Sequence, residues 1–128
     1  MNMLSLAFQR EVNELLGKVP KTRGALKNLL KNGLVLLQAE KLEPAILRLA
    51  AAARLSEHLL GHAHPDTLDV QESLASVLHD LGDLDSARVL YEQVLNLRER
   101  LFGPEYPNTV VSRHNLANVL FEDRKSVV

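Results

Sequence analysis

The chain has 128 residues and a formal net charge of −1, is 46% apolar but only 4% aromatic, and contains neither tryptophan nor cysteine. This content is enough for one core, and the shortage of aromatic residues favours Leu, Ala and Val packed between helices. The absence of cysteine excludes disulfides and thiolate metal sites, and a cytoplasmic protein is expected. No apolar run approaches the roughly 18 residues of a membrane-spanning helix, so no membrane span is expected.

The first predicted element is an amphipathic helix over residues 3–16, inside an N-terminal segment 1–20 that lacks a basic secretory leader. Gly17 and Pro20 are its predicted end. Its apolar stripe consists of Leu4, Phe8, Val12, Leu15, Leu16 and Val19. The next predicted helix, 23–38, is apolar nearly all round, which predicts burial. We expect helix 3–16 to cap the fold by covering helix 23–38, with a dimerisation or membrane-surface helix as the alternative.

Charge is distributed unevenly along the chain. Residues 1–48 hold eight basic and four acidic side chains, so the remainder is acidic. A basic half can indicate a nucleic-acid or acidic partner. No aromatic platform or arginine cluster accompanies these lysines, so a solvated helix face is the favoured interpretation, and no nucleic-acid partner is expected.

Two segments of the chain recur at a distance of 42 residues. LLGHAHPDT at 59–67 returns as LFGPEYPNT at 101–109, and LASVL at 74–78 returns as LANVL at 116–120. Such recurrence is typical of repeat proteins, in which each unit buries its apolar face against its neighbour. We predict an array over 21–124, with units at about 23–64, 65–106 and 107–124. The tail 125–128 is expected to be truncated or non-native.

Each unit is predicted to be a helical hairpin, because apolar residues of the second unit fall at spacings of three and four in two successive runs. Gly82 suits the left-handed cap that ends the first helix, and Asp83 can accept backbone N–H groups at the start of the second. Small residues such as Ala75 and Ala87 let helices approach closely. Ala87→Leu is therefore expected to destabilise the chain by about 1–3 kcal/mol through overpacking.

The second unit resembles the tetratricopeptide-repeat family, and its 42-residue period and linker at 60–67 are similar to those of kinesin light chains. The positions that carry the resemblance are Leu74, Ala75, Leu78, Gly82, Leu84, Ala87, Tyr91 and Val94. The resemblance implies an all-α, right-handed superhelical solenoid of about two and a half repeats behind an N-terminal capping helix. It also implies a protein-interaction module, an adaptor or scaffold, that binds a peptide or helix of a partner in a concave groove lined by the first helices.

We call the positions that the resemblance assigns to this groove the predicted groove residues. They are Asp69, Glu72, Ser76, His79, Asp80, Val111, His114, Asn115, Asn118, Phe121 and Glu122. Since the part in the second unit is acidic, the expected partner carries Lys or Arg beside an apolar anchor, and its binding is expected to be salt-sensitive. The alternative is that these side chains are ordinary solvated residues.

The array ends on a predicted first helix, 108–122, with no second helix behind it. Its face bearing Leu116, Val119 and Leu120 is expected to be partly exposed. Self-association through this face is one expectation, and a frayed monomer is the other. An oligomerisation or sensor arm of a larger signalling protein is the alternative to the peptide-binding function.

A catalytic or metal-dependent function is not expected. His58, His62, His64 and Asp66 lie close together in the sequence, as zinc ligands do, but the next unit has Pro104 and Tyr106 in place of His62 and His64. No phosphate-binding loop or catalytic triad pattern is present. We therefore predict a non-enzyme that uses no cofactor and holds no metal.

Overall fold

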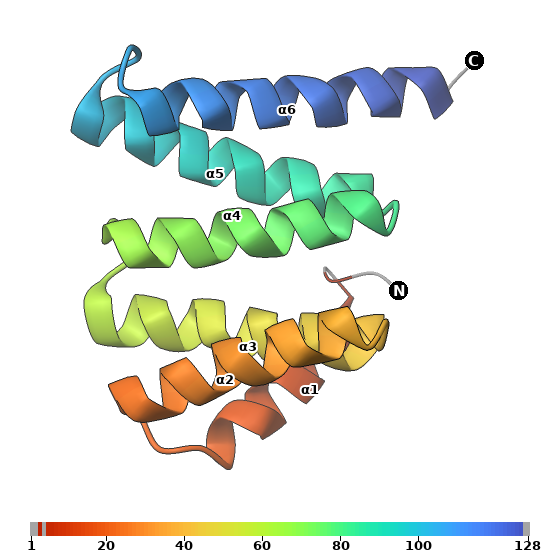
Figure 1. The fold of residues 1–128 in the computed structure, drawn as a ribbon, viewed down its shortest axis with the longest axis vertical. Helices are drawn as coiled ribbons and strands as arrows, with labels where there is room; N and C mark the ends of the chain where they lie inside the picture. Colours follow the sequence, from red (N-terminus) through yellow and green to blue (C-terminus); the bar gives the residue numbers. More distant parts are fainter. Residues whose placement is uncertain (1–2, 4, 127–128) are drawn as a thin grey trace. The chain divides into compact units, whose positions relative to one another are not determined.

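The computed structural model describes residues 3 and 5–126, and within them the chain is helical and contains no strand (Figure 1). The helices are α1 (Leu6–Gly17), α2 (Arg23–Gln38), α3 (Leu42–Leu60), α4 (Pro65–Asp80), α5 (Leu84–Phe102) and α6 (Pro107–Ser126). The starts of α2, α4 and α6 at residues 23, 65 and 107 follow the spacing of the recurrent segments. The predicted all-α helical repeat fold is confirmed.

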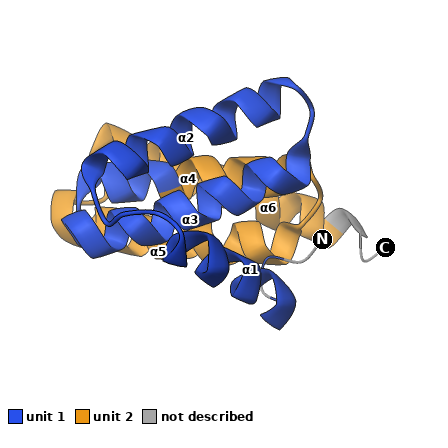
Figure 2. Ribbon diagram, turned by 90° about the horizontal axis from the view of Figure 1, so that it is seen from below, with its two compact units in different colours: residues 1–70 blue, residues 71–128 orange. Residues whose placement is uncertain are grey.

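The chain divides into two compact units, residues 1–70 and 71–128, with the boundary inside α4 (Figure 2). We call them unit 1 and unit 2. Unit 1 contains α1, α2, α3 and the start of α4, and unit 2 contains the rest of α4 with α5 and α6. None of the helices in the described residues is long and apolar enough to cross a membrane.

The turn between α4 and α5 forms as the sequence predicts. Gly82 has a φ of 86°, in the left-handed region that favours glycine. The N–H of Asp83 donates to the carbonyl of Leu78 at 2.9 Å, which closes the end of α4. The carboxylate of Asp83 accepts the N–H of Ser86 at 3.4 Å and so begins α5. Local hydrogen bonding therefore sets both ends of this turn.

Glu40 occupies the same place between α2 and α3, with a φ of 59°, and is the one non-glycine residue with positive φ in the described chain. A side chain in this conformation is strained, because its Cβ crowds the backbone. We expect Glu40→Gly to raise the free energy of unfolding by about 0.5–1 kcal/mol. The reciprocal variant Gly82→Ala should lower it by a similar amount, since the space around Gly82 is open and only backbone strain changes. Urea unfolding followed by circular dichroism measures both, and equal stabilities for the two variants would contradict this explanation.

In unit 1, α2 packs against α3 at a very close approach. A Cβ atom added to Gly33 would lie 3.0 Å from the Leu49 side chain, so a larger residue here would require Leu49 to move. Ala51 and Ala52 are completely buried on the neighbouring part of α3. These small residues make α3 the centre of the unit.

Two expectations about unit 1 are wrong. The N-terminal helix contacts α3 rather than covering α2, and it does so with Phe8 and Val12 buried. Burying these two large apolar side chains stabilises the contact of α1 with α3. Helix α2 is also not buried all round, since Leu34 and Val35 are each 55% exposed. Leu4, which the sequence places on the stripe of the N-terminal helix, lies outside the described residues, and the predicted role of residues 1–20 as a cap stays a prediction.

In unit 2, α5 packs against α6, and Ala87 of α5 is completely buried. The face of α6 that bears the recurrent LANVL segment is partly exposed. Val119 is buried, Leu116 is half-buried and Leu120 is 41% exposed, as expected of a partly exposed face. Ala117 is exposed, whereas its repeat equivalent Ala75 on α4 is completely buried.

Helix α6 is longer than the predicted helix 108–122, because it continues to Ser126. The position equivalent to Gly82 is Arg124, so the residue that ends α4 in the left-handed conformation has no counterpart here. The predicted tail 125–128 therefore begins inside a helix, and its last two residues lie outside the described residues.

Candidate functional site

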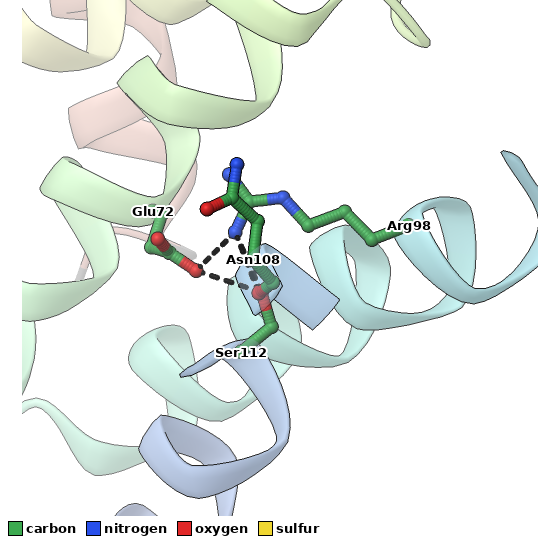
Figure 3. Close-up of polar contacts among 4 residues, drawn as sticks. All are labelled: Glu72, Arg98, Asn108 and Ser112. Carbon is green, nitrogen blue, oxygen red and sulfur yellow. Dashed lines mark hydrogen bonds and ion pairs between the residues drawn. The ribbon is translucent and has the colours of Figure 1, made fainter. Parts of the chain in front are cut away.

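A buried arginine joins the helices of unit 2. Arg98 of α5 has a side chain only 3% exposed, and its guanidinium lies 2.7 Å from a carboxylate oxygen of Glu72 on α4 (Figure 3). The same nitrogen donates to the hydroxyl of Ser112 on α6 at 2.6 Å and reaches the carbonyl of Asn108 at 3.5 Å. The Ser112 hydroxyl in turn donates to Glu72 at 2.9 Å. We call these four residues the arginine cluster.

The arginine cluster has a structural role, because its members pair with one another inside unit 2. A buried charge is tolerated only where an opposite charge and further hydrogen bonds replace its hydration, and the cluster supplies both. Sequence reasoning missed Arg98, although a signal was present. Arg98 falls on the apolar stripe of α5, three or four residues after Val94 and Leu95 and four before Phe102. A charged residue on the apolar stripe of a helix indicates that its side chain is buried with an oppositely charged partner.

The predicted groove residues lie mostly at the surface of the two first helices, α4 and α6. Asp69 belongs to unit 1 and the others to unit 2. Only Glu72, His79 and Asn115 are half-buried. The exposed members are Asp69, Ser76, Asp80, Val111, His114, Asn118, Phe121 and Glu122.

Several predicted groove residues of unit 2 already contact other side chains of the unit. Glu72 is part of the arginine cluster, and the Nε2 atom of His79 lies 2.9 Å from a carboxylate oxygen of Glu122. Ser76 forms a hydrogen bond with the Tyr91 phenol of α5. The contacts of Glu72 and His79 join α4 to α6 near both ends of the face, so that a ligand would meet a surface with its polar groups partly prearranged.

Burial raises the pKa of the Tyr91 phenol above its ordinary value of 10.0. The hydrogen bond from Ser76 lowers this pKa, whereas the negative charges of Glu72 and Asp80 raise it further. A raised pKa favours the neutral phenol in the folded chain. Its contribution to stability is therefore complete below pH 10 and is lost as the pH rises through the pKa of the folded state.

Two measurements check this prediction. In the Tyr106→Phe variant Tyr91 is the only tyrosine, and its absorbance titration should have a midpoint above pH 10. As the pH rises from 9 to 11, the free energy of unfolding should fall less for Tyr91→Phe than for the parent chain. A midpoint at or below the ordinary value would contradict the described environment of Tyr91.

Unit 1 contains a cleft of about 720 Å³ that the sequence did not indicate. We call it the unit-1 cleft. Its buried and half-buried walls are mainly apolar, and its exposed lining is charged, with both signs present. The apolar side chains are Leu26, Leu30, Leu60 and Val70, and the charged ones are Arg23, Lys27, Asp66 and Asp69. Of these, only Asp69 is a predicted groove residue.

The histidines considered as metal ligands lie in unit 1. The Nδ1 atom of His64 accepts the N–H of Asp66 at 3.0 Å and lies 3.9 Å from the Asp66 carboxylate. The hydrogen bond lies in the first turn of α4, which begins at Pro65. His58 and His62 line a small cleft with Arg54 and Glu57. In the part of the chain that the structure describes, no three His, Asp or Glu side chains are grouped so that they could hold a metal ion.

Comparison with known proteins gives one result. A family model described as tetratricopeptide repeat matches the chain twice, over residues 25–99 and over residues 66–126. Together the two matches cover most of the chain, from α2 to the end of α6. No curated protein matches the chain.

Proposed function

Because the chain belongs to the tetratricopeptide-repeat family, we propose that it binds an extended or helical segment of a partner protein along the exposed faces of its first helices, α2, α4 and α6. Repeats of this family are in general protein-interaction modules and non-catalytic scaffolds. The observation that best supports peptide binding is the unit-1 cleft, which combines apolar walls with a charged rim. An adaptor or scaffold of the 42-residue kinesin-light-chain type, acting in the cytoplasm, is the form of this proposal that the sequence favours.

The chemistry of the partner follows from the exposed charges of α4. Asp69 and Asp80 are acidic and exposed, which favours a partner segment with Lys or Arg beside an apolar anchor. Exposed charges attract over a distance that salt shortens, from about 30 Å at 0.01 M to about 8 Å at 0.15 M ionic strength. Binding of such a segment should therefore weaken as salt is added.

The test is a selection of random twelve-residue peptides, displayed on phage, against the whole chain. We expect enrichment of peptides that contain a large apolar residue with a basic neighbour, and a dissociation constant that rises several-fold between low and physiological salt. Asp80→Lys should weaken these peptides, whereas Glu105→Lys makes the same charge change in the turn after α5 and should leave them unchanged. Failure to enrich any peptide would contradict peptide binding, and binding insensitive to salt would contradict its electrostatic part.

Self-association is a second candidate function, favoured by the exposed face of α6. Ala117 and Leu120 are exposed there, whereas the equivalent Ala75 and Leu78 of α4 are buried. An apolar face of this kind on an end helix can pair with a second copy. Sedimentation over a hundredfold range of concentration tests it. A mass that stays that of the monomer would exclude this candidate, and a mass that rises for the parent chain but not for Leu120→Glu would support it.

A further inference from the structure

The unit-1 cleft and the arginine cluster involve equivalent positions of two successive repeats. Moving 42 residues back along the chain takes Arg98 to Ser56, Glu72 to Leu30 and Ser112 to Val70. Arg98, Glu72 and Ser112 belong to the arginine cluster, and Ser56, Leu30 and Val70 line the cleft. In unit 2 the long Arg98 side chain occupies this position, whereas in unit 1 the short, completely buried Ser56 side chain lies against the cleft.

The change of residues also changes the polarity of the site. In unit 2 the acceptors for the guanidinium are the Glu72 carboxylate and the Ser112 hydroxyl. In unit 1 the corresponding walls are Leu30 and Val70, which accept no hydrogen bond. The Ser56 hydroxyl is already paired with that of Thr67 at 2.9 Å. An arginine at position 56 would therefore lack the carboxylate and hydroxyl acceptors that Glu72 and Ser112 give to Arg98, so the Leu30 and Val70 walls suit an apolar side chain.

The rim of the cleft carries opposite charges on its two sides. Arg23 and Lys27 are exposed on α2, and Asp66 is exposed on α4. The Asp66 side chain is 72% exposed, and its carboxylate lies 3.9 Å from Nδ1 of His64. The α2 side of the rim therefore attracts a negative group, and the α4 side attracts a positive one.

We propose that the unit-1 cleft receives one large apolar side chain of a partner peptide, such as Leu, Met or Phe, with an acidic residue on its α2 side and a basic residue on its α4 side. The proposal rests on the proposed peptide binding and deepens it. It names the position of the apolar anchor and adds an acidic neighbour to the basic one. The partner thereby supplies what Arg98 supplies within unit 2, a long side chain that fills the space between three helices.

The probes are the peptides enriched from the random twelve-residue library, together with synthetic versions of the best one. In these versions the apolar residue becomes Ala or Arg, or its two charged neighbours are exchanged. Dissociation constants come from fluorescence anisotropy with the whole chain. We expect the version with Ala in place of the apolar residue to bind at least tenfold more weakly than the parent peptide. The version with Arg in that place should bind no better than the Ala version. Methyl resonances of Leu30, Leu60 and Val70 should shift when the parent peptide is added.

Variants of the protein test the same position. The triple variant Leu30→Glu, Ser56→Arg and Val70→Ser copies the arginine cluster into unit 1 and should fill the cleft with its own side chain. It should keep its helical circular-dichroism spectrum and lose at least tenfold in affinity. Because a triple change can prevent folding, Lys27→Glu provides an independent variant at an exposed position. It should weaken the parent peptide several-fold and favour the version with exchanged charges. The control Lys31→Glu makes the same charge change on α2 outside the cleft and should leave affinity unchanged.

The outcomes separate the two proposals. If peptides bind but neither Lys27→Glu nor the apolar residue→Ala change affects them more than the controls do, the cleft is not the anchor site and peptide binding stands. The same conclusion follows if the methyl shifts fall only on unit 2. If no peptide is enriched, peptide binding itself fails, and the anchor proposal fails with it.

Discussion

Arg98→Leu should lower the free energy of unfolding by about 2–4 kcal/mol. The change leaves the Glu72 carboxylate and the Ser112 hydroxyl without the guanidinium that they share, and unpaired groups of this kind are unfavourable inside a protein. The Glu72 side chain is 21% exposed and can recover part of its hydration, which keeps the loss below that of a completely buried pair. Urea unfolding followed by circular dichroism at 222 nm measures the difference.

A triple variant gives the matched control for this prediction. Arg98→Ser with Glu72→Leu and Ser112→Val copies into unit 2 the residues that unit 1 has at the equivalent positions, and it leaves no charge unpaired. We expect it to recover at least half of the stability lost by Arg98→Leu, because apolar groups that replace a buried pair as a set are close to neutral. A single variant within about 0.5 kcal/mol of the parent would contradict the structural role of the arginine cluster.

Ala75→Leu should destabilise the chain by about 1–3 kcal/mol, and its repeat equivalent Ala117→Leu should change the free energy of unfolding by less than about 0.5 kcal/mol. The two positions have the same sequence context, LASVL and LANVL, but Ala75 is completely buried and Ala117 is exposed. Three extra carbon atoms at Ala75 must displace neighbouring side chains, whereas at Ala117 they enter solvent. Ala87→Leu, on the buried face of α5, should behave as Ala75→Leu does.

The same unfolding measurements compare these variants, at a protein concentration low enough to keep the chain monomeric. Equal effects at Ala75 and Ala117 would mean that the face of α6 is covered in solution. A stabilisation by Ala117→Leu that grows with protein concentration would point to a second copy as the cover, because association stabilises the folded state by mass action.

The predicted groove residues show where sequence reasoning about a site reaches its limit. The resemblance placed them on α4 and α6, and most are exposed there, but it said nothing of the contact between His79 and Glu122. It also passed over α2, where Lys27 and Leu30 line the unit-1 cleft. The sequence shows that Ser56 is smaller than its repeat equivalent Arg98, but a cleft is visible only when the surrounding helices are in place.

The amino-acid sequence by itself determined the helices, their hairpin turns and the repeat family of this protein. Those features depend on interactions within a few residues, such as the apolar spacing of α5 and the left-handed Gly82, and the order of residues along the chain contains them completely. Only the tertiary structure decided that α1 packs on α3, that Arg98 is buried and that a cleft opens in unit 1. Glu72, Arg98 and Ser112 are 26, 14 and 40 residues apart in pairs, and whether a charge is buried or a space filled depends on which distant side chains meet there.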